Sequence, residues 1–283
     1  MLMTSWVVAD KKRRELKREL DQERLEYARM AGELDAAQKI QLATLPDPAA
    51  VEGLPSTLSI HALLEPAREV GGDLYDIFML DEHRLFFLIG DVAGKGVPAS
   101  LFMVLSKALC KSSAWRSSDS IDQLISTANL EISRENPSSL FVTAVAGILD
   151  ARTGAIEFCN AGHAAPFLFQ PGQAPEKLRS QGGPPLCAVD DFTYPVAYAQ
   201  MRSGDILIIT TDGVTEARAG NEMYGGGRIM TFLSTLAPDA HLEEIVEGLY
   251  ADVKQFGIKT ELEDDITILA IKYQNPISEN GCR

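Results

Sequence analysis

Two aspartates next to glycine stand at the ends of two neighbouring apolar runs. Asp73 opens the run at 74–80, and Asp91 closes the run at 84–90. Two strands joined by a short turn lie antiparallel, so the start of one lies beside the end of the next and both carboxylates should meet at one sheet edge. Close carboxylates repel each other unless a proton or a divalent cation lies between them. This pair therefore predicts a metal site.

Two further acidic positions have the same setting. Asp212 closes the apolar run at 205–211 just before a glycine, and Asp264-Asp265 opens the run at 265–272. A single strand-end acid is usually a turn former or a cap, but several beside glycines are harder to explain in that way. Oxygen ligands suit Mg²⁺ or Mn²⁺. Two such ions about 3.5–4 Å apart can share a water, lower its pKa and neutralise phosphate charge. The pattern predicts hydrolysis of a phosphate ester without a protein nucleophile.

The elements that must position these residues are mostly strands in hairpin-like order, with pairs of helices between them. We expect strands at 57–64, 74–80, 84–90, 140–149, 155–160, 166–170, 205–211 and 265–272, and helices at 97–113, 120–134, 227–236 and 241–256. Asp119-Ser120 is expected to cap the second helix, 171–190 to be loop, and 222–228 to be mobile. This order disfavours strict βαβ alternation and favours an α+β fold of antiparallel sheets with helices outside.

The N-terminal part reads as one long helix over 10–45, ended by Pro46-Asp47-Pro48. Heptad positions a and d fall on Leu20, Tyr27, Leu34, Gln41 and on Leu16, Glu23, Met30, Ala37. Glu23 and Gln41 are poor residues for such positions. The pattern favours a parallel dimer stalk, and a single helix packed on the domain is the alternative. We expect a helical linker or coiled coil at 1–50, a catalytic domain at 51–275 and a disordered tail at 276–283.

Composition narrows the class of protein. The 283-residue chain has a formal net charge of −14, which argues against nonspecific binding to nucleic acid or to anionic membrane. Four cysteines without a C-x-x-C pair fit a reducing, cytoplasmic compartment: Cys110, Cys159, Cys187 and Cys282. The first nine residues, MLMTSWVVA, precede DKKRR. They could be the cytoplasmic end of a membrane helix in a longer protein, with a membrane or sensor domain upstream, or a natural start.

Six ordered segments carry a family resemblance. EVGGDLYD, IGDVAGKGVPASLFM, FVTAVAGILD, NAGHAAPFL, GDILIITTDGVTEAR and EDDITILAI resemble the SpoIIE/RsbU-type branch of the PPM (PP2C-like) serine/threonine protein phosphatases. The resemblance covers about 58–273, and AQKIQLATLPDP is similar to the linker before such domains. It implies an αββα sandwich with two Mn²⁺ or Mg²⁺ ions at one end. It also implies a substrate: phosphoserine or phosphothreonine on a STAS-type anti-anti-sigma protein, whose dephosphorylation frees a sigma factor.

The resemblance also implies roles for particular residues. Asp73, Asp91, Asp212 and Asp264 match the catalytic, metal-binding aspartates, with Asp91 bridging the two ions and the backbone carbonyl of Val92 as a further ligand. Asp264 aligns better with the ligand of the DDITIL segment than Asp265, which stands where the wider family often has asparagine. Asp265 is kept as a second candidate metal ligand.

The family's phosphate-holding arginine and leaving-group histidine have no secure match in this chain. Candidate substrate contacts are Arg68, Gly72 and Lys95, the last in a Gly-Lys-Gly turn that precedes a helix N-terminus, where anions bind readily. A surface arginine and a solvated lysine are the alternative interpretations. His163 fits a hydrogen-bonded turn histidine better than a catalytic one.

Two rival functions and one regulatory hypothesis remain. Cys110 and Arg116 have the C-x₅-R spacing of cysteine-dependent phosphatases, but KSSAW between them lacks glycine, so a chance match is favoured. A catalytically silent binding or signalling module is the second rival. Because the heptads run almost directly into the domain, we also expect the helix at 10–45 to dimerise, order the Gly71-Gly72-Asp73 turn and so control metal occupancy.

Overall fold

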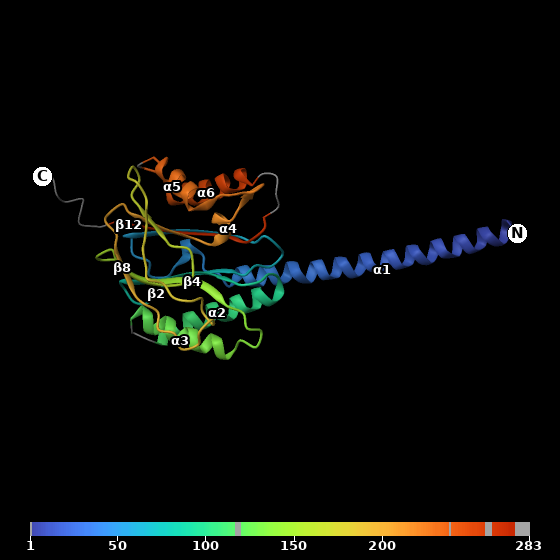
Figure 1. Cartoon of the computed structure of the whole chain (residues 1–283), viewed down its shortest axis with the longest axis horizontal. Helices are drawn as coiled ribbons and strands as arrows, with labels where there is room; N and C mark the ends of the chain where they lie inside the picture. Colours follow the sequence, from blue (N-terminus) through green and yellow to red (C-terminus); the bar gives the residue numbers. More distant parts are fainter. Residues whose placement is uncertain (1, 117–119, 238, 258–261, 275–283) are drawn as a thin grey trace.

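Two five-stranded sheets face each other, and a pair of helices covers the outer face of each (Figure 1). The computed structural model describes residues 2–116, 120–237, 239–257 and 262–274. One sheet has the order β1 (Leu58–Glu65), β12 (Ile266–Tyr273), β9 (Ile206–Thr210), β6 (Phe167–Phe169) and β7 (Glu176–Lys177). The other has the order β2 (Asp73–Met79), β3 (Arg84–Val92), β4 (Val142–Asp150), β5 (Ala155–Ala161) and β8 (Ala197–Gln200). All these strand pairs are antiparallel.

The helices lie as the αββα prediction requires, and that prediction is confirmed. Helices α2 (Val97–Arg116) and α3 (Ile121–Arg134) pack on the β2–β8 sheet, whereas α5 (Gly225–Ser234) and α6 (Leu242–Phe256) pack on the β1–β7 sheet. The short elements are η1 (Pro48–Ala50), α4 (Asp212–Thr215) and the hairpin of β10 (Arg218–Ala219) and β11 (Glu222–Met223).

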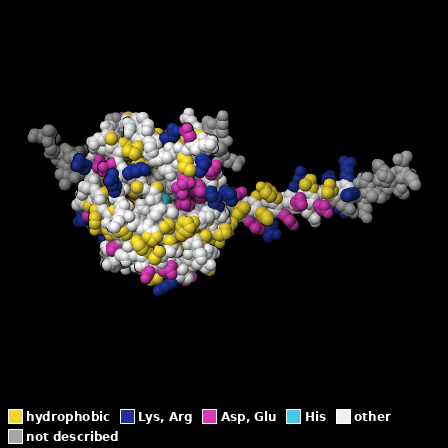
Figure 2. Space-filling view, in the orientation of Figure 1, with side chains coloured by type: hydrophobic (Ala, Val, Ile, Leu, Met, Phe, Trp, Pro, Cys, Tyr) yellow, Lys and Arg dark blue, Asp and Glu magenta, His cyan; other side chains and the backbone are white. Residues whose placement is uncertain are grey.

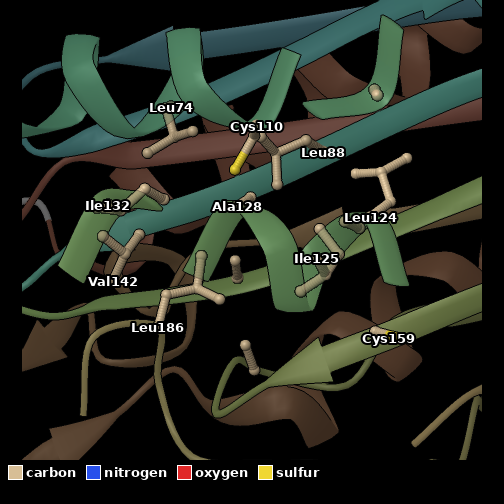
Figure 3. Close-up of a cluster of buried hydrophobic side chains, with 14 of the residues drawn as sticks. Leu74, Leu88, Cys110, Leu124, Ile125, Ala128, Ile132, Val142, Cys159 and Leu186 are labelled. Atoms are coloured by element: carbon tan, nitrogen blue, oxygen red, sulfur yellow. The ribbon is translucent and has the colours of Figure 1, made fainter. Parts of the chain in front are cut away.

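Three apolar cores hold these layers together. Along β3, alternate side chains point to opposite faces. Phe86 and Leu88 pack toward α2 and α3, whereas Leu85, Phe87 and Ile89 fill the space between the sheets. Figure 3 shows the first of these cores, where Leu88 lies near Cys110 and side chains of α3. Burial on both faces explains why this strand reads as a continuous apolar run.

Some local expectations were wrong. Strand β8 was missed because it is a short edge strand with alternating half-exposed residues. The segment at 222–228, expected to be mobile, forms β11 and the start of α5. Ser120 does stand at the N-cap of α3, but its hydroxyl donates to the Asp122 carboxylate and accepts no backbone N–H. Asp119 and the tail at 276–283 lie outside the described residues.

Helix α1 (Leu2–Ala43) extends away from the sandwich (Figure 1). Its predicted heptad stripe is largely exposed, with Leu16 at 66% and Tyr27 at 76% exposure. Toward its end Leu34 is half-buried and Gln41 is buried. The helix therefore contacts the domain through its last turns, and the coiled coil remains a prediction. No helix in the described ranges is both long and apolar enough to span a lipid bilayer.

Candidate metal centre

Asp73, at the start of β2, and Asp91, near the end of β3, are direct register partners. The sequence prediction that they meet at one sheet edge is therefore confirmed. Asp73 is 2% exposed, and its Oδ2 accepts hydrogen bonds from the hydroxyls of Thr211 (2.7 Å) and Thr267 (2.6 Å). Thr267 lies in β12 of the facing sheet, and Thr211 directly follows β9 of that sheet. Burial, followed by the negative charges of Asp91 and Asp265, raises the pKa of Asp73 well above its usual value. This carboxylate thus joins the two sheets at the site.

Asp212 and Asp264 approach the same edge from the other sheet. Burial, followed by the negative charges of Asp212 and Asp264, raises the pKa of Asp91 to about 7. The pKa of Asp212 is raised as well, first by burial and then by Asp264. Figure 2 shows acidic side chains gathered on this face of the domain, next to basic ones. The edge therefore concentrates negative charge that a divalent cation would offset.

The donors at this edge fit Mg²⁺ or Mn²⁺, because they are carboxylate and carbonyl oxygens. Within the described ranges, no three acidic, histidine or cysteine side chains converge closely enough to enclose a metal ion. Asp264 is half exposed and pairs with Lys95, whose Nζ lies 2.9 Å from its Oδ2. A cation is therefore already held against this carboxylate, and a metal ligand role for Asp264 requires Lys95 to move.

Asp265 makes contacts of a different kind from its neighbour. Its carboxylate accepts hydrogen bonds from the backbone N–H groups of Ala67 (2.8 Å) and Gly72 (2.6 Å). A Cβ at Gly71 would lie 2.4 Å from its Oδ2, so only glycine fits at that position. These bonds fix the loop before β2. They favour a positioning role for Asp265 over the predicted ligand role.

The Val92 carbonyl lies beside the acids, as its predicted role requires. A Cβ at Gly72 would lie 2.9 Å from this carbonyl oxygen and 3.4 Å from Oδ1 of Asp91. Gly72 thus allows the loop before β2 to approach the end of β3 closely.

The three expected substrate contacts, Arg68, Gly72 and Lys95, all line one small hollow of about 10 Å³ beside Asp264 and Asp265.

His163 lies close behind the acidic edge but is poorly suited to proton transfer. Its Nδ1 is 2.9 Å from the hydroxyl of Thr143, the register partner of Asp91. Its backbone N–H donates to Oδ1 of Asn160. Burial lowers the pKa of His163 to about 4, so the ring is neutral at pH 7. These contacts support the interpretation as a hydrogen-bonded turn histidine.

The C-x₅-R spacing is a chance match. Cys110 is fully buried in the core of Figure 3, and burial, followed by the charge of Asp76, raises the pKa of its thiol to about 12. Arg116 donates from Nη2 to both carboxylate oxygens of Glu131, at 2.6 and 2.8 Å. A thiolate phosphatase needs a reactive thiolate next to an arginine that can hold phosphate, and neither condition is met.

Sequence reasoning missed several residues that shape the site. Thr211 and Thr267 bind Asp73, and each lies within two residues of a predicted acid, which was an available signal. Gln41 binds Gly71 through its side-chain amide. A polar residue at a heptad core position was the available signal that its side chain makes a hydrogen bond within the domain and does not pack against a second helix. These residues hold the loop and carboxylates in place.

Comparison with known proteins agrees with this geometry. The family model of Stage II sporulation protein E (SpoIIE) matches residues 81–274. Protein IcfG of Synechocystis is 29% identical over 76% of this chain and 38% of its own length. The phosphoserine phosphatase RsbU of Bacillus subtilis is 24% identical over 76% of this chain and 63% of its own. The chain thus spans less than two thirds of either relative.

A solved structure supports the fold independently. The SiaA-PP2C domain of Pseudomonas aeruginosa superposes with a TM-score of 0.75 at 23% identity, covering 87% of this chain and 98% of that domain. With more than half of its residues matched by the family model, the chain belongs to the SpoIIE family.

Proposed function

We propose that this chain is a metal-dependent protein phosphatase that hydrolyses phosphoserine or phosphothreonine. The observation that carries the proposal is the pairing of Asp73 with Asp91 at an edge that Asp212 and Asp264 also approach. RsbU, which is similar to about three quarters of this chain, is a phosphoserine phosphatase. A buried edge with excess negative charge suits phosphate ester hydrolysis only when cations offset that charge.

The ligand set we propose for two Mn²⁺ or Mg²⁺ ions is Asp73, Asp91, the Val92 carbonyl, Asp212 and Asp264. When bound, the ions would supply an activated water and neutralise phosphate charge. Thr211 and Thr267 fix Asp73 by donating to one of its oxygens. Asp265 holds Gly72 and Ala67 and so maintains the loop that carries Asp73. These roles separate the ligands from the residues that position them.

The substrate we propose is a phosphorylated STAS-type protein, as the family resemblance implies. Arg68, Gly72 and Lys95 line one small hollow next to the acids, and the exposed guanidinium of Arg68 could hold a phosphate at its edge. A larger cavity of about 720 Å³ adjoins Asp264 and Lys95 and extends between α4 and α6. It provides room for the polypeptide around the phosphorylated residue.

We place this reaction in the cytoplasm, where the free thiols of Cys110, Cys159 and Cys187 would stay reduced.

The first test is hydrolysis of an aryl phosphate by the full chain with Mn²⁺, with EDTA, and by Asp212→Asn. We expect turnover that requires Mn²⁺ and falls below about 1% of the parent rate in the variant, because a carboxylate ligand is lost. Activity that persists in EDTA would contradict the proposal. An inactive parent that also binds no Mn²⁺ in calorimetry would favour the silent binding module.

We further propose that two copies associate through the exposed heptad stripe of α1. Leu20→Glu should raise the dimer dissociation constant at least ~100-fold, because the dimer loses two buried leucines worth ~1.5–3 kcal/mol each. Leu25→Glu is the matched control, since Leu25 is also exposed but lies off the stripe. Sedimentation velocity of both variants measures the effect. Equal association of the two variants would argue against this interface.

A further inference from the structure

The last turn of α1 makes a paired hydrogen bond with the loop that carries Asp73. Nε2 of Gln41 donates to the carbonyl of Gly71 at 2.6 Å, and the N–H of Gly71 donates to Oε1 of Gln41 at 3.2 Å. Gln41 is 5% exposed and is the one buried side chain among those described in α1. A primary amide satisfies both groups of one residue at once, whereas a carboxylate cannot donate and an apolar side chain can do neither.

Hydrogen bonds of neighbouring residues connect the Gln41–Gly71 pair to the acidic edge. Gly71 lies between Gln41 and the carboxylate of Asp265, which in turn accepts the N–H of Gly72. The carbonyl of Gly72 accepts the N–H of Val92, and Asp73 follows directly. A shift of Gln41 therefore moves the segment that places Asp73 opposite Asp91.

A second contact fixes the same end of the helix. The hydroxyl of Tyr75, in β2, donates to the carbonyl of Pro46 at 3.0 Å. Thr44 closes the last turn by donating its N–H and its hydroxyl to the carbonyl of Gln41. The chain is thus attached at Gln41 in the final turn of α1 and at Pro46 just after the helix, and the position of this turn is defined relative to β2.

We propose that Gln41 is a positioning residue for the metal centre. In this role the end of α1 holds the loop that places Asp73. The inference rests on the proposed phosphatase function and identifies how α1 reaches that site. It also explains a polar residue at a heptad core position. Gln41 cannot face a second helix and Gly71 at the same time. A helix that pairs with the stripe as far as Gln41 would therefore release the loop before Asp73.

Three variants of the full chain test this role. Gln41→Leu removes both hydrogen bonds to Gly71, whereas Gln41→Glu removes the one that Nε2 donates to its carbonyl, and the two variants change the apolarity of the stripe in opposite directions. Gln38→Leu is the control, since Gln38 lies one turn earlier on α1 and is half-buried. We expect both Gln41 variants to weaken Mn²⁺ binding in calorimetry at least 10-fold and to raise the Mn²⁺ concentration for half-maximal aryl phosphate hydrolysis. The rate at saturating Mn²⁺ should change less than threefold.

Hydrogen exchange without metal provides a readout that is independent of activity. The amides of Gly71 and Gly72 should exchange at least 10-fold faster in both Gln41 variants than in the parent or in Gln38→Leu. Unchanged exchange and unchanged Mn²⁺ binding in the Gln41 variants would overturn the inference, even with a fully active parent. Faster exchange in the Gln41 variants, combined with a parent chain that neither binds Mn²⁺ nor hydrolyses phosphate, would instead refute the proposed function and leave the Gln41–Gly71 coupling in place.

Discussion

Gly213→Ala is expected to lower aryl phosphate hydrolysis at least ~100-fold while most of the fold persists. A Cβ at this position would lie 1.9 Å from the carbonyl oxygen of Asp265. The atoms nearest to this Cβ all belong to the backbone of Asp264 and Asp265, so no side chain can rotate away, and either α4 or the start of β12 has to move. Helix α4 carries Asp212, and β12 begins just after Asp264. Misplacing catalytic groups by about 1 Å can cost ~100-fold in rate.

Circular dichroism melting and Mn²⁺-dependent hydrolysis of the purified variant separate the two effects of this change. Gly227→Ala is the matched control, because nothing lies within 4 Å of its added Cβ and the residue is inside α5. Alanine there should stabilise the helix by up to ~1 kcal/mol and leave the rate unchanged. A Gly213→Ala protein with at least half the parent rate would show that this close approach does not position the acids.

The sheets were largely predictable because several of their strands are apolar over nearly their full length. Nearly every residue of β3, β9 and β12 is buried. Their continuous apolar sequences were therefore enough to identify them as strands. Strand β8 lacked that signal, since an edge strand needs no continuous apolar run. The pairing of Asp73 with Asp91 was predictable for another reason, because a hairpin with a short turn fixes its own register.

The roles of individual site residues were less accessible. Asp264 and Asp265 have the same sequence setting, yet one pairs with Lys95 at the surface and the other binds backbone N–H groups of the loop before β2. The partners of Asp265 lie almost 200 residues earlier in the chain. Only the folded arrangement of the two sheets decides which carboxylate turns inward, so a local pattern cannot separate these two roles.

Asp76 is a buried charge that its sequence context concealed. It lies within the apolar run of β2 and is 0% exposed. Its carboxylate pairs with Lys107 Nζ at 3.1 Å and Lys111 Nζ at 3.2 Å, and both lysines belong to α2. Their spacing of four residues puts the two ammonium groups on one face of that helix. This ion triad therefore ties α2 to β2 behind the site.

Asp76→Asn should lower the melting temperature by roughly 10 °C. Removing one partner of a buried ion pair typically costs ~3–5 kcal/mol, and each kcal/mol shifts the midpoint of a domain of this size by about 2–4 °C. The control is Asp35→Asn, which breaks an exposed pair with Lys39 on α1 and should cost only ~0.3–0.5 kcal/mol. Thermal denaturation followed by circular dichroism measures both variants.

A second substitution distinguishes loss of charge pairing from loss of packing. Lys107→Met added to Asp76→Asn should recover part of the lost stability, because apolar residues often replace a buried ion pair at little cost. If packing at Asp76 were the cause, the second substitution would add to the damage. A single Asp76→Asn variant that melts within 2 °C of the parent would mean that water or another anion compensates the two lysines. In that case the attachment of α2 to β2 would depend on the apolar contacts between them and not on this triad.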